Sequence, residues 1–350
     1  MKKLNRILLM FLATSLFLVS CNSDDDSAPN TPLGAYDNGL FVLNEGNSNP
    51  SSASITFVGN NGNSEQDAYT NVNPTATGLG SYLQSIFFDD TRAFIISGSA
   101  NQVTVVNRYT LEHIATVNTN FNNPRYGAVL NGKAYVTNYA TDYSSGADDF
   151  LTVIDLSTYA TSQIAMNNWS EKIIEENGKL YIQNGYYGNG TSITVFDPAT
   201  SVSEVIELGF SPNSLEEEDG TLFVLGGEKL AKINLSNNQI IGTPIVVSTA
   251  SYPSAKNLTI EDNKMYYTEN TSVYTMNLSA TTAPTAPLFS YTSTSLYGGM
   301  YGFAVNDGKI YVAEGGNFAS DSEVYIYSMT GTLLDTIAVG VGPNGFYFND

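Results

Sequence analysis

The stretch Asn131-Gly132-Lys133-Ala134-Tyr135 is one copy of a pattern that returns along the chain. Each copy begins with a two-residue turn and continues as an apolar strand that carries an aromatic residue. Asn-Gly and Asp-Gly pairs between apolar runs are typical of tight β-hairpins, because both central residues of the turn need a positive φ. The pattern therefore predicts a chain built from hairpins. The other copies begin at Asn177, Asp219, Asp262 and Asp307, with weaker ones at Asp89 and Asp37.

The aromatic residues of these copies divide the chain into periods. They stand at positions 41, 94, 135, 181, 223, 266 and 311, so the successive spacings are 53, 41, 46, 42, 43 and 45 residues. A period in the low forties that holds several short strands is typical of a β-propeller, in which each period folds into one blade. Seven aromatic anchors therefore predict an all-β fold, a seven-bladed β-propeller.

One period can be divided into the four strands of a blade. Residues 126–130 are predicted to form the inner strand, 134–137 the second, 151–155 the third and 162–166 the outer edge.

The two ends of the chain predict how the ring closes. Phe41 has no inner strand before it, whereas residues 344–348 form an inner strand with nothing after it. We therefore expect the C-terminal strand to pair with the segment around Phe41 and complete the first blade. Closure would hide two sheet edges that are otherwise open to aggregation. A division into two domains at half-length is the alternative.

The composition agrees with this fold and limits the partners. Hydrophobic residues make up 42% of the 350 residues and charged residues only 14%. The 23 Tyr and 17 Phe residues favour strands. Asp and Glu number 34 against 14 Lys and Arg, a net charge of −20. Because such a surface repels a phosphate backbone, nucleic acid is a poor partner.

The N-terminus has the pattern of a secretory signal. Residues 1–20 hold three basic side chains followed by a 13-residue apolar run, and residues 18–21 resemble a bacterial lipobox. In such a motif Cys21 is lipidated and becomes the new N-terminus, which predicts an outer-membrane lipoprotein. The alternative is an ordinary thiol, which could form no disulfide within the chain because Cys21 is the only cysteine.

Residues 21–36 are predicted to be a flexible acidic tether, since their composition cannot bury a core. The acidic residues 23–26 resemble the export signal that sends Bacteroidetes lipoproteins to the cell surface; a solvated spacer is the alternative. Residues 37–350 are predicted to form the single propeller.

Two sets of motifs resemble known propellers. Residues 134–138, Ala-Tyr-Val-Thr-Asn, followed by the strand at 151–158, resemble the repeat of YncE-like proteins. Residues 39–47, 79–86 and 123–126 resemble Bacteroidetes surface-lipoprotein propellers, which include the BtuG-type cobalamin-binding proteins. No sharp motif transfers a ligand contact, and the single Trp169 cannot supply the docking tryptophans of quinoprotein dehydrogenases.

This resemblance implies a cell-surface protein that binds a nutrient and passes it to an outer-membrane transporter or its accessory proteins. A corrinoid such as cobalamin is the first ligand it suggests, with no cofactor of the protein's own. An interaction scaffold at the outer membrane and a carbohydrate-binding protein are the alternatives.

Candidate ligand contacts gather in the loops at the predicted top face, where large aromatic and polar side chains are frequent. Rigid aromatic rings interspersed with Asn and Gly suit a large planar or sugar-like ligand. The candidates are Arg125, Tyr126, Tyr139, Tyr143, Trp169, Glu171, Tyr186, Tyr187, Asn213, Tyr252, Tyr297 and Phe318.

A second set of small or polar residues stands three positions after each anchor. Blade symmetry predicts that they form a ring around the upper mouth of the central channel. They are either polar caps of the strand ends or an acceptor-rich floor to the site. Ca²⁺ would suit such oxygen ligands, but no loop has regular ligand spacing. The ring consists of Asn44, Ser97, Asn138, Asn184, Gly226, Glu269 and Glu314.

Catalytic chemistry finds little support in the sequence. The only histidine, His113, is expected to be structural or solvent-facing on an outer strand, so an imidazole-based triad is not favoured. Because no cysteine follows Cys21, a zinc site built from imidazole or thiolate is excluded. A carboxylate pair remains an alternative, with Glu45, Glu171, Glu269 and Glu314 as candidates, but their spacing does not define an acid and a base. We therefore expect a binding protein and not an enzyme.

Overall fold

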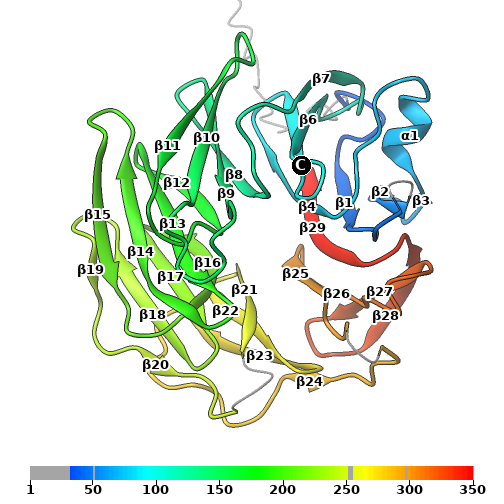
Figure 1. The fold of residues 1–350 in the computed structure, drawn as a ribbon. Helices are drawn as coiled ribbons and strands as arrows, with labels where there is room; N and C mark the ends of the chain where they lie inside the picture. Colours follow the sequence, from blue (N-terminus) through cyan, green and yellow to red (C-terminus); the bar gives the residue numbers. More distant parts are fainter. Residues whose placement is uncertain (1–31, 50–51, 251–254, 296–297, 350) are drawn as a thin grey trace, which may run out of the picture. The chain divides into compact units, whose positions relative to one another are not determined.

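Seven antiparallel sheets make up the described chain, as predicted (Figure 1). The structure is a computed structural model that describes residues 32–49, 52–250, 255–295 and 298–349. Cys21, the signal segment and most of the tether lie outside these ranges, as do Tyr252 and Tyr297. Residues Leu33–Asp350 form one compact unit.

The blades are numbered in chain order, and the inner strand of each is given first. Blade 1 contains β29 (Pro343–Asn349), β1 (Gly39–Asn44), β2 (Ser54–Gly59) and β3 (Ser64–Glu65). Blade 2 contains β4 (Leu83–Phe88), β5 (Arg92–Ser97), β6 (Gln102–Asn107) and β7 (His113–Val117). Blade 3 contains β8 (Pro124–Leu130), β9 (Lys133–Asn138), β10 (Phe150–Asp155) and β11 (Thr161–Ala165). Blade 4 contains β12 (Ile173–Glu176), β13 (Lys179–Tyr186), β14 (Asn189–Asp197) and β15 (Val202–Glu207).

The remaining blades follow the same order. Blade 5 contains β16 (Pro212–Glu218), β17 (Thr221–Gly226), β18 (Lys229–Asn234), β19 (Gln239–Ile240) and β20 (Ile245–Val246). Blade 6 contains β21 (Lys256–Glu261), β22 (Lys264–Glu269), β23 (Ser272–Asn277) and β24 (Phe289–Ser290). Blade 7 contains β25 (Gly302–Asn306), β26 (Lys309–Ala313), β27 (Ser322–Ser328) and β28 (Leu333–Val339).

The C-terminal strand closes the ring as expected. β29 pairs antiparallel with β1, and Phe41 lies opposite Tyr347 in the register. In Figure 1 the red β29 lies beside the blue β1. Its far side contacts β25 of blade 7 and β4 of blade 2, so the last strand joins both neighbouring blades. The first period is longer than the others because the short helix α1 (Ala68–Val72) and its connections are inserted between β3 and β4.

The predicted hairpins form for the expected backbone reason. In the clear copies both turn residues have positive φ, for example 50° at Asn131 and 73° at Gly132. The turn of the weaker copy at Asp89 is held by side-chain hydrogen bonds. The Asp89 carboxylate accepts them from the backbone N–H groups of Thr91 and Arg92, at 3.0 and 2.7 Å.

The seven aromatic anchors explain the period. The described core divides into seven apolar clusters, each lying between two adjacent blades. Each cluster contains one anchor, which packs from the second strand of its blade against the next blade. Burying such a ring contributes about 1.5–3 kcal/mol. The repeat therefore recurs because every blade must fill the same gap. The anchors are Phe41, Phe94, Tyr135, Tyr181, Phe223, Tyr266 and Tyr311.

His113 lies on β7, the outer strand of blade 2, as predicted. Its Nε2 is 2.9 Å from the Thr116 hydroxyl. Within the described ranges, no helix has the length and apolar character that crossing a membrane requires.

Candidate functional site

The inner strands begin at one end of the ring, which we call the top, and most carry a β-bulge there. The register skips Gln84 in β4, Arg125 and Tyr126 in β8, and Asn213 in β16. A bulge leaves the extra residue out of the ladder and redirects its side chain. Blade 4 shows the same feature: Gln183 accepts a hydrogen bond from the N–H of Glu171 and donates one to the Lys172 carbonyl.

These redirected residues line a central cavity of about 900 Å³ that runs between the inner strands. Five of the sequence-predicted residues line it, together with Glu45, which was a candidate acid. The five are Arg125, Tyr126, Tyr186, Tyr187 and Asn213.

Arg125 organises one side of this cavity. Its Nε and one terminal nitrogen donate to both carboxylate oxygens of Glu171, at 3.0 and 2.9 Å. The other terminal nitrogen donates to Oε1 of Gln84 at 2.5 Å. Burial alone would lower the pKa of Arg125, but the charge and hydrogen bonds of Glu171 raise it above its ordinary value. The guanidinium is thus held in place, with two of its five donor hydrogens left over.

An aromatic wall stands beside this ion pair. The Arg125 guanidinium lies 4.6 Å from the ring centre of Tyr139, and that ring packs edge-on against Tyr186 at 4.2 Å. Trp169 packs behind Tyr186 at 5.8 Å. Because Tyr139 and Trp169 are only 1% and 4% exposed, these two predicted ligand residues support the wall from behind.

Tyr187 is the most exposed ring of this group, at 88%. It occupies the turn between β13 and β14 with a φ of 45°, followed by Gly188 at 88°. This hairpin is built from the two longest strands of the described chain, so it extends beyond its neighbours and raises Tyr186 and Tyr187 above the blade. The ring of Tyr187 packs on Tyr186 at 4.4 Å and is otherwise free to meet a ligand.

The opposite rim is built by blades 1 and 7. The Tyr301 hydroxyl donates to Oε2 of Glu45, and the Tyr301 ring packs edge-on against Phe318 at 5.0 Å. Burial raises the pKa of Glu45, although the Tyr301 hydrogen bond and the charge of Arg125 oppose this shift. Phe318 therefore supports Tyr301 from outside the cavity.

Tyr126 lines the cavity from blade 3. Its hydroxyl accepts a hydrogen bond from Gln84 at 3.1 Å, and burial raises the pKa of Tyr126 to about 12.

The polar ring predicted three residues after the anchors has a structural explanation. These residues lie at or near the ends of the second strands, whereas the channel is lined by the inner strands. Asn44, for example, is fully buried and donates to the Ser54 and Thr56 hydroxyls of its own blade at 3.0 Å. The geometry therefore favours strand caps over a solvated floor. Ser97, Asn138, Asn184 and Glu314 are likewise buried, and Glu269 accepts a hydrogen bond from Ser248.

Other candidates are more scattered. Tyr143 is 54% exposed in the β9–β10 loop and does not line the central cavity. Tyr252 and Tyr297 lie outside the described residues. In the part of the chain that the structure describes, no three His, Cys, Asp or Glu side chains are grouped so as to hold a metal ion.

Sequence reasoning missed several residues that line the cavity. They share one signal, a position at the start of an inner strand that recurs at the blade period. The missed residues are Gln84, Lys172, Lys256, Asn257 and Asn344.

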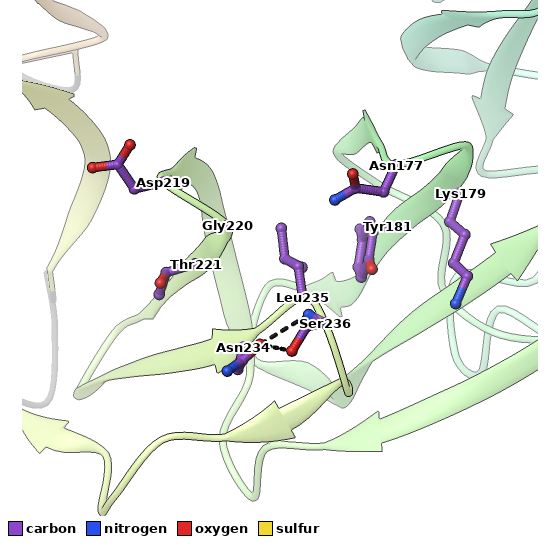
Figure 2. Close-up of a pocket in the computed structure, with 9 residues that line it drawn as sticks. All are labelled: Asn177, Lys179, Tyr181, Asp219, Gly220, Thr221, Asn234, Leu235 and Ser236. Carbon is purple, nitrogen blue, oxygen red and sulfur yellow. Dashed lines mark hydrogen bonds between the residues drawn. The ribbon is translucent and has the colours of Figure 1, made fainter.

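A second cavity of about 570 Å³ lies at the other end of blades 4 and 5. Figure 2 shows that it is lined by turn residues such as Asp219 and Asn234, and that the Asn234 carboxamide is hydrogen-bonded to Ser236. None of the predicted ligand residues lines it. Its lining consists of hairpin residues and of core residues such as the anchor Tyr181, so the central cavity is the candidate site.

Comparisons with known proteins agree with the fold. A family model, described as a domain of unknown function (DUF5074), matches residues 38–349. A quinonprotein alcohol dehydrogenase-like protein (BT1487) from Bacteroides thetaiotaomicron superposes with a TM-score of 0.68 at 18% identity, over 90% of this chain and 79% of that one. No curated protein sequence matches the chain.

Two further solved structures share the propeller at 13% identity. BamB from Moraxella catarrhalis has a TM-score of 0.54 over 88% of this chain and 90% of that chain. PorZ, a surface component of the type-IX secretion system of Porphyromonas gingivalis, has a TM-score of 0.52 over 86% of this chain and 38% of that chain. At these identities the likeness concerns the fold alone.

Proposed function

The chain belongs to the DUF5074 family, and we propose that it is a cell-surface propeller that binds a nutrient at the top of its central cavity without transforming it. The observation that carries the proposal is the cavity itself. It has the volume of a small-molecule site and combines exposed aromatic rings with a small number of fixed polar groups.

The polar groups of the upper cavity suit recognition better than catalysis. Glu171 has both carboxylate oxygens engaged by Arg125, and Glu45 accepts a hydrogen bond from the Tyr301 hydroxyl. A general acid or base needs a carboxyl group that can exchange its proton with substrate. Groups held in this way instead offer a rigid surface, which lowers the entropy lost on binding.

The point at which the N-terminal segment leaves the propeller supports the proposal of surface attachment. Residues 33–36 leave it at the bottom, where the N–H of Tyr36 donates to the Tyr109 carbonyl at 2.9 Å. If Cys21 carries the lipid, the tether reaches the propeller at the end opposite the cavity top. By this proposal a corrinoid is the first ligand to examine, and an outer-membrane transporter or its accessory proteins receive it. PorZ, named as a bacterial surface component, offers a precedent for the fold in that location.

Titration with cobalamin and cobinamide tests the ligand. We expect micromolar or tighter binding by calorimetry, and quenching of Trp169 fluorescence because Trp169 packs directly behind Tyr186. Tyr187→Ala should weaken binding by about 1–3 kcal/mol without changing stability, since its ring is an exposed anchor.

Tyr82→Ala is the matched control, because Tyr82 is 41% exposed and does not line the cavity. No heat with either corrinoid at micromolar protein would remove the corrinoid proposal. Equal affinities for the Tyr187 variant and the wild type would place the site away from the aromatic wall.

A further inference from the structure

Two lysines reach the same central cavity from blades that are not adjacent. Lys172 sits in the bulge before β12 of blade 4, and Lys256 begins β21 of blade 6. Blade 5 lies between them and contributes Asn213 and Glu216 to the cavity wall. The two ammonium groups therefore flank one blade from either side.

Neither lysine forms an ion pair. The ion pairs among the described residues are Arg92 with Asp89 and Arg125 with Glu171. Burial lowers the pKa of Lys256, and no carboxylate opposes that shift. Burial also lowers the pKa of Lys172, although the charges of Glu216 and Glu171 partly oppose it. Both side chains are half-buried, and the Lys172 ammonium lies 5.9 Å from the ring centre of Tyr126. A partly desolvated cation without an ion-pair partner is costly, so each ammonium favours an anion beside it.

The backbone holds both lysines ready for such a partner. The Lys172 carbonyl accepts a hydrogen bond from Gln183 at 2.8 Å, and the Lys256 carbonyl accepts one from Thr268 at 3.3 Å. The Asn213 amide donates to the carbonyl of Ala255, directly before Lys256, at 2.8 Å. Only the flexible side chains remain to be ordered on binding, which limits the entropy lost.

We propose that Lys172 and Lys256 form a subsite for an oxyanion, a phosphate or carboxylate group of the ligand that enters from the top of the cavity. This subsite rests on the proposed binding function, and it specifies that the ligand carries a negative charge. Each ammonium offers three donors, and charge-assisted hydrogen bonds are about twice as strong as neutral ones. Arg125 plays a different part, because its charge is already balanced by Glu171.

Calorimetric titration with inorganic pyrophosphate tests the subsite directly. We expect the wild type to bind it, and Lys172→Met or Lys256→Met to weaken that binding by about tenfold, the value of one charge-assisted hydrogen bond. Lys264→Met is the matched control, since Lys264 is exposed at the start of β22 and does not line the cavity. Thermal melts establish that each variant is folded. Absent binding by the wild type at millimolar pyrophosphate, or equal loss in the control, would overturn the subsite.

A corrinoid pair separates this subsite from the proposed function. Cobalamin carries a phosphodiester in its nucleotide arm, and cobinamide lacks it. If the subsite holds this group, the wild type prefers cobalamin and Lys256→Met loses that preference. Corrinoid binding with an unchanged preference in the variant would remove the subsite and leave the function. Conversely, lysine-dependent pyrophosphate binding without corrinoid binding would keep the subsite and require another ligand.

Discussion

The two arcs of the ring around the cavity use the same bulge position in different ways. In blades 5, 6 and 1 an asparagine at this position donates to a backbone carbonyl of the next blade. Asn213 reaches Ala255 at 2.8 Å, and Asn257 reaches Met300 at 3.3 Å. Asn344 reaches the Leu83 carbonyl at 2.8 Å. We call these three blades the latch arc.

Blades 2, 3 and 4 form the charged arc, in which the bulge residue is linked from side chain to side chain. Hydroxyl groups add links to backbone carbonyls there, from Ser85 to Arg125 and from Thr137 to Glu171, both at 2.7 Å. Arg125 joins Gln84 of the preceding blade to Glu171 of the following one. A link to a backbone carbonyl works with any neighbouring residue, whereas a link between side chains depends on both partners. The bulge residues of the latch arc therefore tie neighbouring blades together, whereas those of the charged arc, which also carries the aromatic wall, supply the chemistry of the site.

The largest loss of stability is expected when one member of the ion pair in the charged arc is removed. Arg125→Met removes the only ion-pair partner that Glu171 has among the described residues and the cation that packs on Tyr139. Removing one member of a buried pair costs about 3–5 kcal/mol, because the other charge stays buried. Urea unfolding monitored by circular dichroism measures the loss.

The control for this variant removes the stranded charge as well. Arg125→Met combined with Glu171→Gln should recover most of the lost stability, since no buried ion is left unpaired. A single variant within about 1 kcal/mol of the wild type would mean that solvent in the cavity screens the pair as it does a surface pair.

The contrast between the arcs also shows what the sequence could predict. Turn chemistry and anchor spacing are local signals, so the blade number, the hairpin at Asn131 and the pairing of β29 with β1 were all predicted correctly. A bulge has no such signal, because its cause is the register between two strands. Lys172 and Asn344 were missed for this reason.

The polar ring was expected around the channel mouth, but none of its residues lines the central cavity, for a related reason. Periodicity shows that Asn44 and Asn138 are equivalent, but not whether the ends of their second strands face the axis or the neighbouring blades. In the structure the second strand lies one position from the axis, and the Asn138 amide turns to the Thr152 hydroxyl of its own blade at 2.9 Å. Which residues meet across the cavity depends on contacts between blades, which the sequence does not encode locally.

A smaller effect is expected from breaking one latch. Asn344→Ala removes the donor to the Leu83 carbonyl, at the junction where the last strand meets blade 2. We expect a loss of about 1–2 kcal/mol, the usual cost of leaving a buried acceptor unsatisfied. Asn118→Ala, at an exposed position after β7, is the control. A variant as stable as the wild type would show that water replaces the Asn344 hydrogen bond. The asparagine links would then not stabilise the ring, and the structural distinction between the two arcs would be withdrawn.

The smallest change in stability is expected from Glu216, which lies on the inner strand of blade 5, where the two arcs meet. Burial raises the pKa of Glu216 to about 7, although the charge of Lys172 opposes that shift. Below the unfolded pKa both states are protonated, so Glu216 contributes no pH dependence there. Between that value and about 7 the unfolded chain ionises first, and stability falls as the pH rises.

Glu216→Gln should remove this pH dependence because the amide cannot ionise. We expect the variant to match the wild type near pH 4 and to exceed it by about 1 kcal/mol at pH 8, once the water in the cavity is taken into account. Thermal melts across this range measure the difference, with Glu207→Gln on the exposed outer strand β15 as the control. An advantage of the wild type over the variant that grows as the pH rises would mean that the carboxylate is stabilised by Lys172. Glu216 would then belong to the charged arc as a paired ion, and Lys172 would no longer be available to an incoming anion.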